Sequence, residues 1–150
     1  MNQFLEIIKK CPLFDGIEDK DLSQMLTCLG AHVEQFDKKY TIFSEGSPAK
    51  YIGILLTGSA QVVQHDYYGN RNILIKILPT EVFAEAFSCA EMPTLPISVI
   101  AAEPCDVMFI ESTHILHTCS NHCMFHQQLI YNLMKNLAGK VILYHHYAKS

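Results

Sequence analysis

The chain opens with hydrophobic residues at helical spacing. Apolar side chains recur every three or four positions in residues 2–10 and again, after a break at residues 11–16, up to Gly30. A glycine at such a point is a common end of a helix. Phe4, Ile7 and Ile8 stand at helical spacing in the first stretch, and the second stretch places on one face Leu22, Met25, Leu26 and Leu29. The pattern predicts N-terminal helices over residues 1–30.

From residue 31 the pattern changes to short runs of apolar and β-branched residues. A turn signal separates the runs about every eight to twelve residues, which is typical of an antiparallel sandwich or roll. The turn segments are EGSP, TGS, DYYGN, LPTE and EPCD. Gly69 and Asn70 tolerate a positive φ, so the segment DYYGNR is expected to close a hairpin. We therefore predict a β-roll core over residues 31–112.

Helical spacing returns at Thr113, and a long amphipathic run extends from His122 to Tyr147 with Gly139 as its interruption. One apolar stripe consists of His126, Ile130, Leu133, Leu137, Val141 and Tyr144, and Leu129, Met134, Ala138 and Ile142 widen it. Such a surface is wider than one small roll would normally cover. We predict C-terminal helices over residues 113–150.

The width of this stripe predicts that the long helix has two partners, its own roll and a second copy of itself. A homodimer would then form through a short coiled coil. The residues expected in the seam are Ile130, Leu133, Leu137, Val141 and Tyr144. A helix that packs only on its own core is the alternative.

Composition supports one folded domain made of these three regions. The 150 residues are 49% hydrophobic and 17% charged, with a formal net charge of −4. This charge offers no broad basic surface for nucleic acid. No apolar run of membrane-spanning length and no export signal is present, so we expect a cytoplasmic protein without a membrane contact. Its six cysteines, which lack a CxxC pair, are expected to be reduced.

The order of helix, β-roll with glycine turns and long amphipathic helix resembles the sensor domain of the Crp/Fnr family of bacterial transcription regulators. The likeness rests on CPLFDGIEDKDLSQML, IFSEGSPAKYIGILLTGSAQVV and YYGNRNILIKILPTEVFAEAF, with Gly46 and Gly58 at two turns. It implies a mainly β fold with flanking helices: an antiparallel β-roll, or double-stranded β-helix, like the cyclic nucleotide-binding domain, followed by a dimerisation helix.

The segment similar to the family's phosphate-binding cassette departs from it at decisive positions. Members that bind cyclic nucleotides carry a Gly-Glu pair and, ten residues after the glutamate, an arginine followed by Ser or Thr. Here Ala84 replaces the glycine, Glu85 remains, and Leu95 stands where the arginine would be. A buried phosphate without a paired cation costs several kcal/mol. Thr80, at another usual glycine, points the same way, so we predict that cyclic AMP and cyclic GMP do not bind.

The altered cassette predicts a pocket lined by apolar side chains around one carboxylate. Its expected residues are Phe83, Ala84, Glu85, Ala86, Phe87, Met92, Leu95, Pro96 and Ile97, with Tyr144 and His145 of the long helix as the far wall by the resemblance. This lining suits an apolar small-molecule effector with one donor group, or no ligand where side chains fill the interior. Glu85 is equally interpretable as a carboxylate that caps nearby backbone N–H groups.

A second candidate site is the Cys/His-rich segment at residues 114–126. On a helix Cys119, Cys123 and His126 share a face, and such residues can bind Zn²⁺ or haem iron. Packing or surface roles are the alternative for these side chains. The cysteine cluster that iron–sulfur members of the family carry near the N-terminus is absent.

These features favour an effector-sensing and dimerisation domain of a transcription regulator. We expect the last helix to continue beyond Ser150 into a helix-turn-helix domain, which would make the DNA contact. A cupin-like metal enzyme is the rival, but His32 and His65 are the only histidines before residue 114 and neither belongs to an HxH pair, so no enzyme is predicted. A ligand-free structural dimerisation module with a sealed pocket is the third hypothesis.

Overall fold

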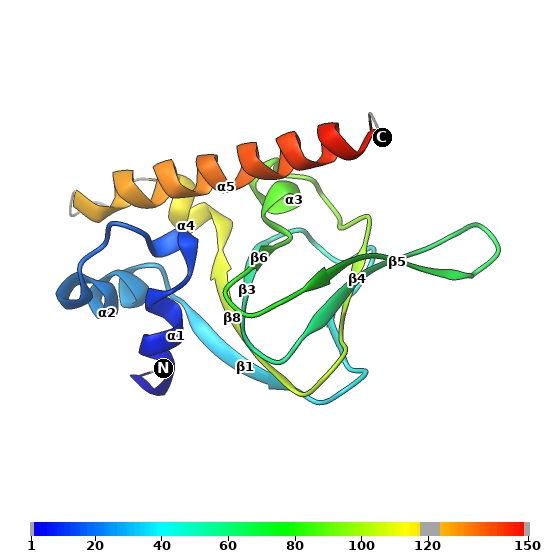
Figure 1. Ribbon diagram of the computed structural model, residues 1–150, viewed down its shortest axis with the longest axis horizontal. Helices are drawn as coiled ribbons and strands as arrows, with labels where there is room; N and C mark the ends of the chain where they lie inside the picture. The colour runs from blue at the N-terminus through cyan, green and yellow to red at the C-terminus, as the bar shows by residue number, and fades with distance from the viewer. Residues whose placement is uncertain (1, 118–123, 149–150) are drawn as a thin grey trace.

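The computed structural model describes residues 2–117 and 124–148, with side chains described for residues 3–117 and 125–142. Short helices come first, eight strands follow, and helices end the chain (Figure 1). The helices are η1 (Asn2–Phe4), α1 (Leu5–Lys9), η2 (Pro12–Phe14), α2 (Asp19–Cys28), α3 (Glu85–Cys89), α4 (Ser112–Leu116) and α5 (Met124–Ala148). The strands are β1 (His32–Phe36), β2 (Thr41–Phe43), β3 (Tyr51–Thr57), β4 (Ala60–His65), β5 (Arg71–Ile77), β6 (Val82–Phe83), β7 (Ser98–Ala101) and β8 (Cys105–Glu111).

The strands form two four-stranded antiparallel sheets that face each other as a roll. Their orders are β1-β8-β3-β6 and β2-β7-β4-β5. Each inner face contributes alternate apolar side chains to the space between the sheets, as expected for strands that bury one face. The mainly β fold with flanking helices that the sequence predicts is confirmed.

The β4–β5 hairpin extends away from the body of the roll (Figure 1). Its turn is closed by the Asp66 carboxylate, which accepts hydrogen bonds from the backbone N–H groups of Tyr68 (2.9 Å) and Asn70 (2.8 Å). Gly69 adopts a φ of 84°, as the sequence predicts, whereas Asn70 keeps a negative φ. Because β5 lies at the sheet edge, its outer residues stay exposed, and Ile73 retains 59% of its accessible surface.

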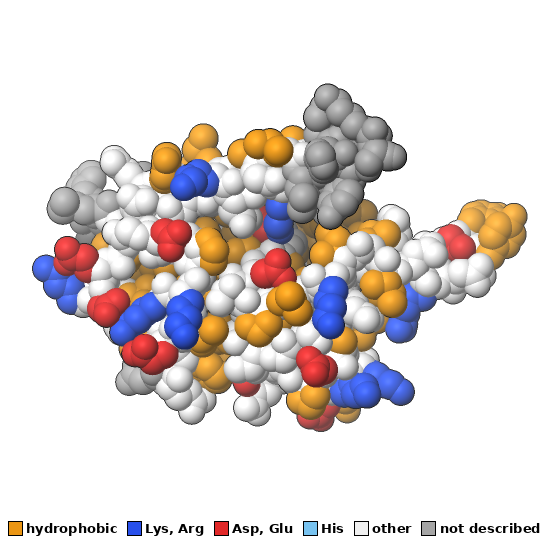
Figure 2. Space-filling model, viewed as in Figure 1, with side chains coloured by type: hydrophobic (Ala, Val, Ile, Leu, Met, Phe, Trp, Pro, Cys, Tyr) orange, Lys and Arg blue, Asp and Glu red, His pale blue; other side chains and the backbone are white. Residues whose placement is uncertain are grey.

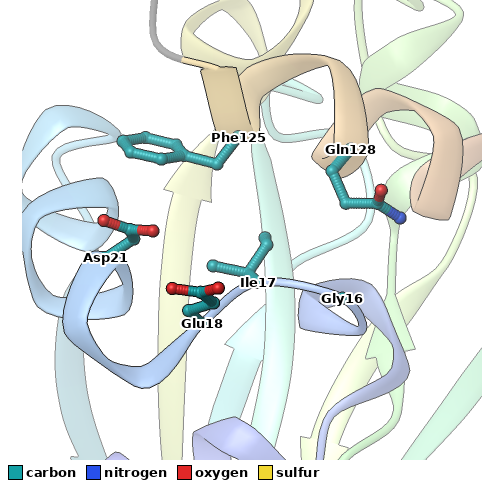
Figure 3. A pocket seen from close by; sticks show the side chains of 6 residues that line it. All are labelled: Gly16, Ile17, Glu18, Asp21, Phe125 and Gln128. Atoms are coloured by element: carbon teal, nitrogen blue, oxygen red, sulfur yellow. The ribbon is translucent and has the colours of Figure 1, made fainter.

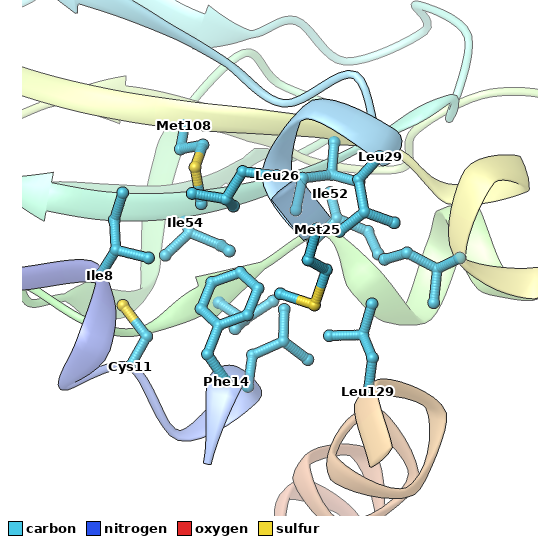
Figure 4. Packing of buried hydrophobic residues seen from close by; sticks show 14 of the residues in the cluster. Ile8, Cys11, Phe14, Met25, Leu26, Leu29, Ile52, Ile54, Met108 and Leu129 are labelled. Carbon is cyan, nitrogen blue, oxygen red and sulfur yellow. The ribbon is translucent and has the colours of Figure 1, made fainter. Parts of the chain in front are cut away.

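The hydrophobic core has two parts. One packs the N-terminal helices, α4 and α5 against the β1-β8-β3-β6 sheet, with Met25, Ile54 and Leu129 among its side chains (Figure 4). The other fills the interior of the roll between the two sheets, around Val99 and Val107. Burial of this kind contributes about 1.5–3 kcal/mol for each large aliphatic side chain.

Helix α5 runs along one side of the molecule and packs against the first of the two core regions. Its first half lies beside α4 and the N-terminal helices, and its second half passes over α3 and β6 (Figure 1). No helix in the described ranges is both long and apolar enough to cross a membrane. The arrangement brings α5 next to the cassette segment, although about fifty residues separate them in the sequence.

Candidate functional site

The backbone of the cassette keeps a glycine-like conformation without glycine. Ala84, the residue before α3, has φ 64° and ψ 5°, and Thr80 has φ 79°. The left-handed region costs an L-residue about 1–2 kcal/mol, and a β-branched residue there is an outlier. Two backbone hydrogen bonds hold the Thr80 turn against β3, from Thr80 N–H to Leu55 O (2.8 Å) and from Leu55 N–H to Glu81 O (3.0 Å). The backbone therefore keeps these left-handed conformations although Thr80 and Ala84 stand where the resemblance predicts glycine.

Glu85 is the buried charged group of the site. Its side chain is 3% exposed and lies at the start of α3. Lys140 of α5 places its Nζ 2.7 Å from each carboxylate oxygen, and Asn136 donates from Nδ2 to Oε2 at 3.2 Å. The same Lys140 ammonium also donates to the carbonyl of Val82 in β6 at 2.8 Å. Both oxygens of the carboxylate are thus engaged by α5.

The positions at which the resemblance predicts the phosphate contact lie in the interior of the roll. Leu95 and Ile97 are 3% and 5% exposed and belong to the apolar core between the sheets, together with Phe83 and Ala84. Backbone hydrogen bonds pair Leu95 with Gly46 and Ser47 on the facing loop. The side chains that pack together here are hydrophobic.

The remaining predicted pocket residues are less buried. Phe87 and Pro96 are half-buried, whereas Ala86 is exposed and Met92 retains 39% of its accessible surface. Phe87 packs against the interior cluster from outside it. The side chains of Tyr144 and His145 lie outside the described residues. The structure therefore places Phe83, Ala84, Leu95 and Ile97 together and separates Ala86 from them.

Helix α5 contacts its own domain through a row of polar residues spaced by four. The row consists of Gln128, Asn132, Asn136 and Lys140. Asn132 is 6% exposed, and its Nδ2 donates to the carbonyls of Leu13 and Asp15, both at 2.8 Å. Gln128 donates to Asn132 Oδ1 at 3.0 Å. Two members of this polar row anchor α5 to the rest of the domain through hydrogen bonds, Asn132 at the η2 segment and Lys140 at α3.

The apolar residues of α5 divide between two faces. Leu129 and Leu133 are 0% and 3% exposed in the core, and Ile130 and Leu137 are half-buried against it. On the outer face Val141 retains 66% of its accessible surface. The outer face as a whole comprises Tyr131, Met134, Ala138, Val141 and Ile142. Hydrophobic side chains are visible along this edge of the molecule and at the tip of the β4–β5 hairpin (Figure 2).

This division differs from the seam that the sequence predicts. Leu133 belongs to the core of its own domain, and Ile130 and Leu137 lie at the border between the two faces. Val141 is the described member of the predicted seam that lies on the exposed face, since the side chain of Tyr144 is outside the described residues. The exposed stripe is rotated around the helix from the predicted one.

A shallow groove of about 400 Å³ lies outside the roll, where α2 meets α5. Glu18 and Asp21 of the α2 segment and Phe125 of α5 border it, and Ile17 lies between them (Figure 3). Its acidic border and open shape do not match the apolar pocket that the cassette predicts. No cassette residue contributes to this groove.

The candidate metal residues are described only in part. Cys119 and Cys123 lie outside the described residues. His126 is 6% exposed, and its Nε2 is buried without a hydrogen-bond partner among the described atoms. Within the described ranges no group of three metal-binding side chains comes together. Near the cassette, burial and then the charge of Glu85 raise the pKa of the Cys89 thiol.

With this geometry established, the comparisons with known proteins identify the family. The profile of the cyclic nucleotide-binding domain matches residues 33–122. The chain belongs to the cyclic nucleotide-binding domain family. A search of curated protein sequences found no match to the chain. The matched range includes the roll, the cassette and α4, so the departures at Ala84 and Leu95 lie within the family's own domain.

Solved structures share the fold of this cyclic nucleotide-binding domain at low sequence identity. The sensor domain of the transcriptional regulator DNR from Pseudomonas aeruginosa is 18% identical, with a TM-score of 0.75 over 93% of this chain and 89% of that chain. A cyclic nucleotide-binding domain from Methylobacillus flagellatus KT is 18% identical, with a TM-score of 0.76 over 93% and 77%.

The catabolite activator protein of Thermus thermophilus is 17% identical, with a TM-score of 0.70 over 92% of this chain and 60% of that chain. The chain thus spans about three fifths of that regulator's length. The sensor-domain fold predicted from the sequence is confirmed.

Sequence reasoning missed the two α5 residues that hold Glu85. Asn136 and Lys140 are polar residues four apart in a helix that is otherwise apolar around most of its surface. Lys140 on a largely apolar helix, together with the Glu85 carboxylate in the cassette, is the sequence signal that could have indicated an ion pair. The resemblance placed the long helix near the cassette through Tyr144 and His145, and it did not indicate that Asn136 and Lys140 would contact Glu85.

Proposed function

We propose that this domain senses and transmits a regulatory signal without binding a cyclic nucleotide, as the sensor and dimerisation part of a Crp/Fnr-type transcription regulator. The main support for this proposal is that the Glu85 carboxylate already has hydrogen-bond partners within the protein. Its two oxygens already accept from Lys140 and Asn136, so a ribose hydroxyl would have to displace an ammonium group. The apolar surroundings of Leu95 supply no cation for the phosphate.

Calorimetric titration of the purified chain with cyclic AMP and cyclic GMP tests this proposal. We expect no saturable heat at ligand concentrations up to about 1 mM. A dissociation constant above this concentration would be too weak for a specific effector. A cyclic nucleotide-binding domain with an intact Gly-Glu pair and arginine serves as the positive control. Saturable binding that Glu85→Gln weakens would overturn the proposal.

The dimer is the second part of the proposed function, and the outer face of α5 is its proposed interface. Tyr131, Met134, Ala138, Val141 and Ile142 form an exposed apolar stripe along a helix of 25 residues. Two such stripes related by a two-fold axis would cover each other as in a short coiled coil. We place the seam on these residues and keep Leu133 in the core. DNA contact would come from a helix-turn-helix domain joined to α5, in the cytoplasm.

Sedimentation velocity tests the interface with charge insertions. Met134→Glu and Val141→Glu are expected to convert a dimer into a monomer, because each puts a carboxylate into the apolar seam. Leu74→Glu is the matched control, since Leu74 is an exposed leucine on β5, 50% exposed and away from α5. A wild-type chain that stays monomeric, or a dimer that only Leu74→Glu dissociates, would contradict the interface.

A regulatory role is favoured over an enzymatic one. A cupin-like site needs several metal ligands that converge inside the roll. His32 and His65 lie on different sheets, and each is half-exposed beside a surface glutamate, Glu34 and Glu45 respectively. These positions support the proposal that the roll transmits a signal and does not catalyse a reaction.

A further inference from the structure

The groove between the α2 segment and α5 has the size of a small-ligand site. Its volume of about 400 Å³ lies within the range of about 300–1,000 Å³ that such sites occupy. Two segments that are far apart in the sequence form it, and its lining residues are Gly16, Ile17, Glu18, Asp21, Phe125 and Gln128 (Figure 3). None of these lining residues belongs to the cassette or to the outer face of α5. A ligand in the groove would therefore not compete for Glu85.

The apolar part of the groove is held in place by the core. Ile17 and Phe125 are half-buried, and both pack against the first core region. Part of each side chain thus contacts the core while the rest borders the groove. Figure 3 shows the Phe125 ring on the same side of the groove as the Asp21 and Glu18 carboxylates. An aromatic ring beside two carboxylates favours a positively charged ligand that also has an apolar part.

Gln128 adds a third acceptor to the two carboxylates. The Nδ2 of Asn132 donates to two backbone carbonyls of the η2 segment, so its Oδ1 is left to accept from Gln128 Nε2 at 3.0 Å. This network sets the orientation of the Gln128 amide and leaves its Oε1 able to accept a further hydrogen bond. A Cβ at Gly16 would lie 3.2 Å from Gln128 Cδ, so the bare glycine backbone lets this amide lie close to it. The groove thus suits a ligand with several N–H donors.

The two carboxylates of the groove can accept an external cation. Asp21 is half-buried, and its carboxylate has no ion pair or hydrogen bond within the part of the chain that the structure describes. Glu18 pairs with Lys20 at 3.2 Å, but these side chains are 68% and 76% exposed, so the pair contributes little. The neighbouring Asp19 pairs with Lys9 at 3.1 Å and does not line the groove. Asp21 is therefore a partly buried charge to which a bound cation would be a partner.

We propose that this groove binds a small organic cation, a guanidinium or ammonium group on a short hydrocarbon chain. The cation would lie between the Asp21 and Glu18 carboxylates and the Phe125 ring. Its hydrocarbon chain would cover Ile17. A guanidinium group is planar, donates through several N–H groups and stacks on aromatic rings, so it fits this combination of groups best. The site goes beyond the proposed function, because it lies apart from both the cassette and the proposed dimer interface.

Titration of the full, isotope-labelled chain with butylguanidinium, followed by amide NMR spectra, tests the site. We expect saturable shift changes at amides 16–21 and 125–128, with a dissociation constant of about 1 mM or lower. Butylurea is the matched control ligand, because it has the same shape without the charge, and we expect no saturable change with it. Ionic strength is held constant, since salt screens exposed charges.

Substitutions of single charges locate the cation. Asp21→Asn is expected to weaken butylguanidinium binding by about fivefold and Glu18→Gln by about threefold, as for ion pairs that water partly reaches. Asp19→Asn is the matched control variant, since it removes the same charge from the same turn of α2 and its carboxylate pairs with Lys9 outside the groove. We expect it to weaken binding by less than about twofold. Lys20→Gln should strengthen binding by about twofold, because it removes the cation that competes for Glu18.

Several results would overturn the site. They are the lack of saturable change up to about 10 mM butylguanidinium, equal binding of butylurea, shift changes confined to other parts of the chain, and equal losses in Asp19→Asn and Asp21→Asn. The comparison of the two ligands needs no variant, so it decides even where a substitution lowers stability. Cyclic nucleotide binding or a monomeric chain would refute the proposed function and leave this site untouched. Failure of butylguanidinium to bind would refute the site alone.

Discussion

The ion pair between Glu85 and Lys140 makes a quantitative prediction about stability. Removing one partner of a buried pair typically costs about 3–5 kcal/mol, because an unpaired charge is left behind. Here the Glu85 side chain is 3% exposed and the Lys140 side chain 37%, so water reaches one end of the pair. Asn136, which donates to Glu85 Oε2 at 3.2 Å, would still offer that hydrogen bond after loss of the lysine. We therefore expect Lys140→Met to lower the free energy of unfolding by about 2–3 kcal/mol.

The converse substitution is expected to be milder. Glu85→Gln keeps the side-chain shape and leaves the partly exposed Lys140 able to gain water, which predicts a loss of about 1 kcal/mol. In the double variant no buried charge remains, so its loss should be clearly smaller than the two single losses together. The predicted coupling energy is about 1.5–2 kcal/mol, within the range for residues in direct contact.

Urea unfolding followed by far-UV circular dichroism measures these free energies. The chain contains no tryptophan, so backbone signal is preferable to intrinsic fluorescence. Protein concentration must be the same for all variants, because dimerisation would add to the apparent stability. Equal m-values are required before midpoints are compared. A coupling energy below about 0.5 kcal/mol would refute the interpretation of this contact as a buried, paired charge.

Three further predictions concern the backbone turn, the near anchor of α5 and a buried thiol. Thr80→Gly should raise the free energy of unfolding by about 1 kcal/mol, because it relieves a positive φ of 79°. Gly46→Ala, at φ 87° with open space around the residue, should lower the free energy of unfolding by about the same amount. Equal shifts of the urea midpoint in both variants would contradict this. Asn132→Ala should lower the free energy of unfolding by about 1–3 kcal/mol, because two backbone carbonyls lose their donor, and Gln128→Ala should lower it by less than about 1 kcal/mol. The opposite ranking of the two variants in urea unfolding would contradict this. Burial raises the pKa of Cys11 from 9.0 to about 12, so the free energy of unfolding should fall as pH rises from 9 toward 12. In melts recorded across this pH range, Cys11→Ala should make that fall less steep. An unchanged slope in Cys11→Ala would contradict this prediction.

The elements themselves could be read from the sequence because their causes are local. The change from helical spacing to short runs near residue 31 and back near Thr113 follows from which side chains must face a core, and strands indeed lie between His32 and Glu111. Local chemistry also predicted the turn at Gly69. The lack of a charge at Leu95 was visible in the same way, because the identity of a residue decides whether it can carry a charge.

What the sequence could not assign was the direction in which each face of α5 points. A helix that is apolar around most of its surface is compatible with several rotations, and a rotation by one position exchanges Leu133 for Met134 at an interface. The structure selects one rotation, because Asn132 must reach the η2 carbonyls while Leu129 and Leu133 enter the core.

The sequence by itself determined the fold and the apolar residue at Leu95, whereas tertiary structure decided which side chains surround the Glu85 carboxylate. Glu85 alone was open to two interpretations, a ligand contact or a cap for backbone N–H groups. Among the described residues, Lys140 and Asn136 lie against it. A buried charge needs a partner, but only packing determines which of the distant residues supplies it.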